Sequence, residues 1–175
     1  GNARLISDPS LNCGHPFLSP RLRVPISRTE LIIALMITLA GFALRFEQLD
    51  LLAVEHFDEG VYASNLIFPD DGFQYPNRFL YGPPLLPSLV EWTSLFFGTA
   101  ADDAKWVPFL PALLLGSLTV PLVWWAGRSW FGGAAGVAAA SLIALSDFHI
   151  VMSRSVLTDA PLLFFLLLAV WVIVE

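Results

Sequence analysis

The chain has 175 residues, of which 56% are hydrophobic and only 14% are charged, and its mean hydropathy is +0.69. Soluble domains carry about 25% charged residues, so this composition excludes an ordinary soluble domain and indicates an all-α integral membrane protein. The net charge of −6 argues against nucleic acid as a partner, and the single cysteine excludes an internal disulfide.

The N-terminal region predicts a tail followed by a first span. Residues 1–24 are rich in Pro, Ser, Asn and Gly without periodicity, which is typical of a disordered tail. The apolar run that follows reaches spanning length if a helix covers residues 25–46, with Ser27 or Thr29 as its N-cap. Arg21, Arg23 and Arg28 stand immediately before the apolar run, so the positive-inside rule places the tail in the cytoplasm.

Residues 47–105 form a long acidic loop that we expect on the extracytoplasmic side. The loop carries ten of the fifteen acidic residues but only two of the nine basic ones. Two short helices are predicted within it, over residues 58–68 and 85–97. The second is apolar but too short to span a bilayer, and it fits an interfacial helix on the outer leaflet.

Three more apolar runs predict spans, which brings the total to about four transmembrane helices. These runs cover residues 106–127, 129–146 and 159–175. The middle run is rich in Gly and Ala, which allows close approach of neighbouring helices. Arg128 separates the first two runs and is expected at the cytoplasmic face. Residues 147–158 therefore return to the side of the acidic loop, and residues 25–175 read as one multi-span membrane domain.

Two adjacent carboxylates, Asp58 and Glu59, open the first helix of the acidic loop. Aromatic and apolar side chains surround them in the sequence, among them His56 and Tyr62. An ionisable group at a membrane edge is costly unless it is paired or hydrated, so the pair is a candidate functional site. His56 and Tyr62 are candidate residues of a substrate pocket beside it.

The order of these features resembles a known group of enzymes. A basic tail and one span lead into an outer loop that opens with Asp-Glu. A Pro-Pro-Leu helix, two spans and the motif Ser-Arg-x-x-x-Thr-Asp-Ala-Pro (153–161) follow. Over residues 27–175 this order is similar to the N-terminal part of GT-C glycosyltransferases that use polyprenyl-phosphate sugars. The group includes protein O-mannosyltransferases and the aminoarabinose transferase of lipid A. Such enzymes are usually longer, so we expect an N-terminal fragment that is inactive alone.

The resemblance implies transfer of a sugar from a polyprenyl-phosphate donor to an acceptor hydroxyl, with inversion, at the extracytoplasmic face. Asp58 matches the acid proposed as general base in this group, and Glu59 matches its neighbour. Asp159 matches a second aspartate, and Arg154 matches the arginine before it. Many bacterial members have Lys-Pro-Pro-Leu where this chain has Gly82 before Pro-Pro-Leu, so a lysine contact to the donor phosphate is in doubt.

Elementary chemistry supports the same assignment. A positioned carboxylate can take the proton of an attacking hydroxyl, which is worth about 10²–10⁴-fold in rate. The leaving phosphate gains negative charge, and Arg154 and Arg78 are the two extracytoplasmic arginines that can meet it. The acceptor is left open as a lipid, a protein or a glycan, and membrane lipids are the other expected partners. No cofactor is certain, although a divalent metal ion is possible.

Structural and functional alternatives stand beside this interpretation. Asp159 before Ala-Pro fits a helix N-cap, Arg154 fits an interface anchor, and Glu59 can pair with Arg78 or Lys105. The chain also fits the N-terminal helical bundle of a transporter or flippase-like protein, or a non-catalytic membrane scaffold. We favour the enzyme because the charges lie at one membrane edge, whereas transporter sites lie near the midplane. The expected location is the plasma membrane.

Overall fold

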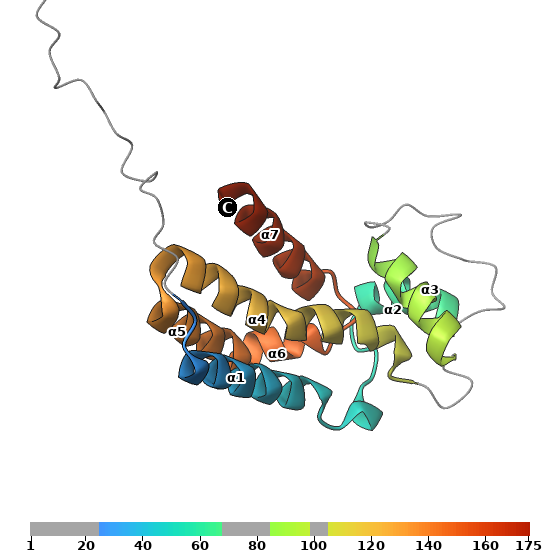
Figure 1. Ribbon diagram of the computed structural model, residues 1–175. Helices are drawn as coiled ribbons and strands as arrows, with labels where there is room; N and C mark the ends of the chain where they lie inside the picture. Colours follow the sequence, from blue (N-terminus) through green and yellow to red (C-terminus); the bar gives the residue numbers. More distant parts are fainter. Residues whose placement is uncertain (1–24, 68–84, 99–104) are drawn as a thin grey trace, which may run out of the picture.

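The computed structural model describes residues 25–67, 85–98 and 105–175. Every regular element in these residues is a helix, which confirms the all-α prediction (Figure 1). In chain order the elements are α1 (Arg28–Phe46), η3 (Leu49–Leu51), α2 (Phe57–Ile67), α3 (Leu85–Phe97), η5 (Val107–Phe109), α4 (Leu110–Phe131), α5 (Gly133–Ala144), α6 (Asp147–Ser153) and α7 (Asp159–Val174). The predicted tail lies outside the described residues.

Within the described residues, two helical stretches are long and apolar enough to cross a membrane. They cover Arg28–Leu51 and Val107–Phe131, with 24 and 25 residues. A third crossing exists if α5 and α6, which are bent by 62°, count as one broken span. Helix α7 is apolar but has 16 residues, or about 24 Å, against a hydrocarbon core of about 30 Å. Length and composition thus support two or three spans, and the expected count of four is not confirmed.

The first three α-helices lie close to their predicted bounds, and a capping residue marks the start of α1. Ser27 is the N-cap of α1, and its hydroxyl accepts a hydrogen bond from Glu30 N–H at 3.0 Å. This arrangement satisfies a donor that the first turn of a helix cannot pair internally. Helix α3 has the bounds expected from the sequence, whereas α2 begins one residue before its predicted start.

The run predicted as one span over residues 129–146 is instead divided between the end of α4 and α5, and α6 begins directly after it. Helix α4 continues to Phe131 and ends at Gly132, whose φ of 96° favours glycine. Helix α5 then has only 12 residues. Beyond it, Ser146 starts a new helix by accepting a hydrogen bond from His149 N–H at 3.3 Å. The chain therefore turns sharply before it has crossed the length of a bilayer.

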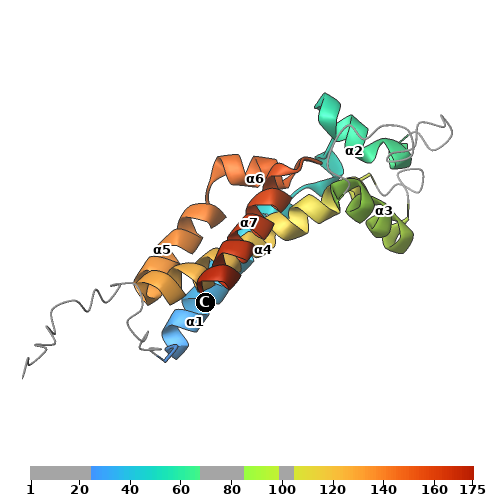
Figure 2. The same cartoon turned by 90° about the horizontal axis from the view of Figure 1, so that it is seen from above.

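Helix α4 is the centre of the bundle and packs against α1, α5, α6 and α7 (Figures 1 and 2). Its contact with α5 depends on small residues, as predicted. A Cβ on Gly136 of α5 would lie only 2.5 Å from the carbonyl oxygen of Trp124 on α4. Any larger residue at this position would push the two helices apart. The buried apolar residues between α1, α4 and α5 are Ala34, Val120, Trp124, Ala140 and Ala144.

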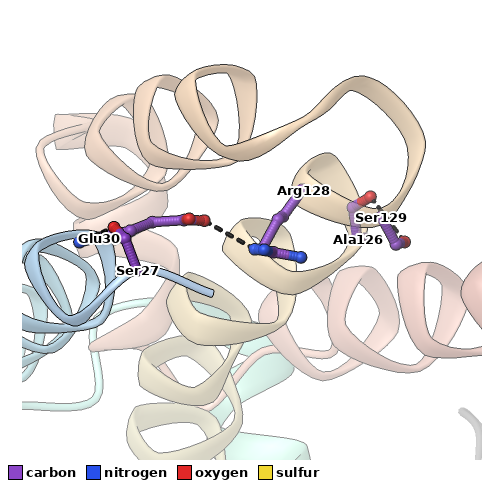
Figure 3. A network of polar contacts seen from close by, with 5 residues as sticks. All are labelled: Ser27, Glu30, Ala126, Arg128 and Ser129. Carbon is purple, nitrogen blue, oxygen red and sulfur yellow. Dashed lines mark hydrogen bonds and ion pairs between the residues drawn. The ribbon is translucent and has the colours of Figure 1, made fainter. Parts of the chain in front are cut away.

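The bundle has two chemically different ends. Figure 2 shows α2 and α3 gathered at one end, beside the start of α4, and we call this the site end. At the other end Arg128 of α4 forms an ion pair with Glu30 of α1, with 2.7 Å between Nε and Oε1 (Figure 3). The candidate residues that the structure describes and Arg128 therefore belong to opposite ends of the bundle.

Candidate functional site

The site end rests on a buried apolar cluster built from five elements. The cluster consists of Ala63, Leu86, Val90, Val107, Phe109, Leu113 and Val156. These residues come from α2, α3, η5, α4 and the turn that joins α6 to α7. Tyr62 is half-buried and packs against the cluster. The apolar packing thus joins the acidic helix α2 to the turn between α6 and α7.

The two acids of the Asp-Glu pair have opposite environments. Asp58 lies in the first turn of α2 and is exposed, and its side chain has no hydrogen-bond partner among the described residues. Glu59 is 2% exposed. An exposed carboxylate with free acceptor positions can approach a substrate, whereas a buried one must be satisfied within the protein.

Glu59 satisfies both of its carboxylate oxygens with backbone N–H groups. Oε2 accepts from Glu55 and His56 at 2.9 and 3.0 Å, and Oε1 accepts from Val156 at 2.8 Å. The bond to His56 is the return half of a capping box, in which the third helical residue reaches back to the N-cap. Glu59 makes no ion pair with Lys105 in the described part of the chain, so that expected pairing is wrong. Its other expected partner, Arg78, lies outside the described residues.

Arg154 lies directly after α6 and reaches across to the end of α1. Its Nη1 donates to the carbonyl oxygens of Glu47 and Arg45 at 2.6 and 3.2 Å. These carbonyls belong to the last turn of α1 and to the residue after it, where a helix leaves its carbonyls unpaired and a positive charge is favourable. The half-buried guanidinium therefore anchors two helices at the site end. A contact to a donor phosphate stays a prediction.

Asp159 is exposed and is the first residue of α7. Thr158 occupies the N-cap position and makes no side-chain capping bond. The N-cap interpretation of Asp159 is therefore wrong, because the helix begins one residue earlier than expected from the Asp-Ala-Pro pattern. A carboxylate in the first turn still faces the favourable end of the helix dipole.

A buried polar cluster, which was not predicted from the sequence, lies at the same end of α1. Arg45 is fully buried and donates to Gly41 O at 2.8 Å, Ile143 O at 3.0 Å and Ala144 O at 3.3 Å. It also contacts His149 Nδ1 at 2.8 Å and Ser153 Oγ at 3.4 Å. The sequence feature that could have indicated the cluster is Arg45 itself, a lone charged residue within the predicted first span. A charge at that place is costly in a membrane unless polar partners surround it.

The arginine cluster explains how the chain tolerates the sharp bend between α5 and α6. A bend leaves the last carbonyls of α5 without helical partners, and Arg45 supplies donors to two of them. The C-terminal end of a helix carries a partial negative charge, which stabilises the guanidinium without a carboxylate partner. The end of α6 also packs closely against α4, since a Cβ on Gly116 of α4 would collide with the side chain of Ser153.

The other predicted site residues are placed as follows. His56 is exposed, and Arg78 and Gly82 lie outside the described residues. In the part of the chain that the structure describes, no three His, Cys, Asp or Glu residues are grouped as metal ligands would be. An open, mostly apolar hollow of about 720 Å³ lies along α5 and contains none of the predicted site residues.

Comparison with known proteins identifies the family. Searches of curated proteins and of solved structures found no significant match. The family model of dolichyl-phosphate-mannose-protein mannosyltransferases matches residues 86–175, just over half of the chain. The matched range contains Arg154 and Asp159 but not Asp58. A hydrogen bond from Val156, within the matched range, to Glu59 connects it to the helix that carries Asp58. The chain therefore belongs to the dolichyl-phosphate-mannose-protein mannosyltransferase family and is a membrane glycosyltransferase of the GT-C type.

Proposed function

We propose that this chain forms part of a site that transfers mannose from a polyprenyl-phosphate donor to a hydroxyl group of a protein. The description of the matched family supports this donor and this acceptor. We further propose that the reaction occurs at the extracytoplasmic face, in the plasma membrane, with the N-terminus in the cytoplasm. The charge asymmetry of the sequence supports this orientation.

The observation that carries the proposal is the contrast between Asp58 and its neighbour. Asp58 is exposed and unpaired among the described residues, on a helix that is bonded to the family-matched segment. In the proposed step the acceptor oxygen attacks the anomeric carbon while Asp58 takes the hydroxyl proton. The bond from that carbon to the phosphate oxygen breaks, and polyprenyl phosphate leaves with the electron pair. Attack opposite the leaving group inverts the anomeric carbon.

Arg154 is suited to meet the charge on the departing phosphate. Only its Nη1 is used by the carbonyls of α1, so Nε and Nη2 have no partner among the described residues. A guanidinium that is already held in place loses little freedom when it binds a phosphate. We assign Asp159 as the second carboxylate of the site, and His56 and Tyr62 as neighbours of the substrate. The family match favours this transferase over the transporter and scaffold alternatives.

Replacement of Asp58 by Asn tests the proposal in the full-length enzyme. The amide keeps the shape of the side chain but cannot take a proton, so mannose transfer should fall by about 10²-fold or more. Asp50→Asn is the matched control, because Asp50 is an exposed acid of the same outer segment and has no proposed role. Near wild-type transfer by Asp58→Asn, measured with a polyprenyl-phosphate-mannose donor and a peptide acceptor, would place the base elsewhere.

A further inference from the structure

Glu59 differs from an accessible catalytic carboxylate because it is buried and each of its oxygens is hydrogen-bonded within the protein. Three backbone N–H groups bind its two oxygens, at distances of 2.8 to 3.0 Å, and the side chain is buried. An ionised carboxylate can only accept hydrogen bonds, which suits the three N–H donors. It has no hydrogen to donate to a substrate. Taking a proton from a hydroxyl would require the side chain to leave these donors.

The three donors come from two segments that are far apart in the sequence. Two belong to residues 55 and 56, at the entry to α2, and the third belongs to Val156, in the turn between α6 and α7. Glu59 therefore connects the helix that carries Asp58 to the segment that carries Arg154 and Asp159. Its side chain forms a hydrogen-bonded link between them.

The turn between α6 and α7 is itself held from other directions. Ser153 at its start is bonded to Arg45 of α1, and Arg154 donates to the carbonyl oxygens that end α1. Val156 has 0% exposure and belongs to the apolar cluster. A segment fixed in this way is a suitable reference point for the position of α2.

We propose that Glu59 is a positioning residue, which latches the first turn of α2 to the turn between α6 and α7 and thereby sets where Asp58 lies. The proposal rests on the proposed role of Asp58 as the base. A base acts only when it lies within hydrogen-bond reach of the proton, and a displacement of about 1 Å can cost on the order of 10²-fold in rate. Loss of the latch thus lowers turnover although Glu59 does not touch the substrate.

The test combines kinetics with a distance measurement in the full-length enzyme. Glu59→Gln replaces one acceptor oxygen by an NH₂ group, which faces a backbone N–H and breaks one side of the latch. Spin labels at Phe57→Cys on α2 and Phe148→Cys on α6, two exposed positions, report the relative position of the two helices. All variants are made in a background without other cysteines. Glu55→Gln is the matched control, because it removes an exposed carboxylate of the same turn, whose side chain has no described bond.

We expect Glu59→Gln to broaden the distance distribution between the labels and to lower kcat on the order of 10²-fold, while the KM for the donor stays near wild type. Glu55→Gln should change neither property. Glu59→Asp keeps the charge but is one methylene shorter, so it cannot reach both segments. It should broaden the distribution too, which provides a second variant if Glu59→Gln folds poorly.

Two results would overturn the latch. Loss of turnover with an unchanged distance distribution would mean that Glu59 acts on the reacting groups, and wild-type behaviour in both measurements would mean that the bonds have no effect on Asp58. A wild-type enzyme that transfers no mannose from the lipid donor would refute the proposed function instead. In that case the label distances still decide the latch, since an unchanged distribution in Glu59→Gln refutes it.

Discussion

The guanidinium of Arg45 donates a hydrogen bond to Nδ1 of His149 at 2.8 Å, and both side chains are buried. A guanidinium has only donors, so Nδ1 must be the unprotonated ring nitrogen and the hydrogen lies on Nε2. His149 is thus a neutral partner, and the other acceptors of Arg45 are carbonyl and hydroxyl oxygens. A buried cation is balanced here by oriented dipoles instead of a carboxylate.

Replacement of Arg45 by Met should therefore destabilise the protein. The carbonyls of Ile143 and Ala144 cannot be removed with the side chain, and each unsatisfied buried acceptor costs about 1–3 kcal/mol. Arg45→Lys should lie between Met and wild type, because an ammonium group has fewer donors and no planar fork. Thermal unfolding in detergent measures the effect. Arg28→Met removes an exposed arginine of the same helix and should leave the unfolding midpoint nearly unchanged. Equal unfolding midpoints for Arg28→Met and Arg45→Met would mean that the bonds of Arg45 do not stabilise the protein.

Gly116 of α4 should not tolerate even the smallest side chain. A Cβ at this position would collide with Cβ and Oγ of Ser153, and overpacking of this kind costs about 1–3 kcal/mol. The double variant Gly116→Ala with Ser153→Gly should recover part of the loss, since the colliding atoms are gone. Unfolding of the single and double variants gives the coupling between the two sites. Gly60→Ala is the control, because its nearest neighbour, Val54 Cγ1, is at an ordinary 3.9 Å. If the losses in unfolding free energy of the two single variants simply add in the double variant, the two residues do not clash directly.

Arg154→Ala should weaken binding of the donor more than it slows chemistry. A charge-assisted hydrogen bond is worth about 1.5–3 kcal/mol, so the KM for polyprenyl-phosphate mannose should rise about 10–100-fold. The same change removes the anchor on Glu47 O, and the unfolding midpoint should fall as well. Lys105→Ala, which removes an exposed cation from the outer segment, serves as the control. A stability loss with an unchanged KM would limit Arg154 to anchoring.

Asp58 and Asp159 should be accessible from outside the cell, with Arg128 inside. Each is replaced by Cys in a background without other cysteines, and intact cells are treated with an impermeant thiol reagent. We expect Asp58→Cys and Asp159→Cys to react and Arg128→Cys to react only after permeabilisation. The physical basis is the charge bias of the loops, together with the separation of these residues at the two ends of the bundle. The reverse pattern of labelling would invert the proposed orientation.

Local patterns predicted most of the helices. The run from Leu85 to Phe97 is apolar and begins with a favourable Pro-Pro-Leu signal, and α3 has these bounds. The first span begins at the Ser27 cap that the sequence indicates. The break near Leu145 was not predictable in this way, because its apolar and small neighbours suit a continuous helix. Arg45, which lies about 100 positions earlier in the chain, stabilises the break by donating to the carbonyl oxygens of Ile143 and Ala144.

The candidate site was predictable only as a list of residue types. Composition and order indicated that Asp58 and Glu59 matter, but not that one is exposed and the other buried. The distinction depends on the N–H of Val156, a backbone group that leaves no trace in the residue pattern. The anchoring of Arg154 on α1 was hidden for the same reason, since its acceptors are also backbone carbonyls.

The partners of Arg45 also impose an order on biosynthesis. Its acceptors on α5 and α6 lie 98 to 108 residues further along the chain. At a synthesis rate of about 5–20 residues per second, α1 exists for roughly 5–20 s before these acceptors leave the ribosome. During that interval the long side chain can extend toward the headgroups, since Arg45 is next to last in its helix. The first span therefore inserts before the partners of Arg45 on α5 and α6 exist, and its arginine can become buried only after these helices are in place.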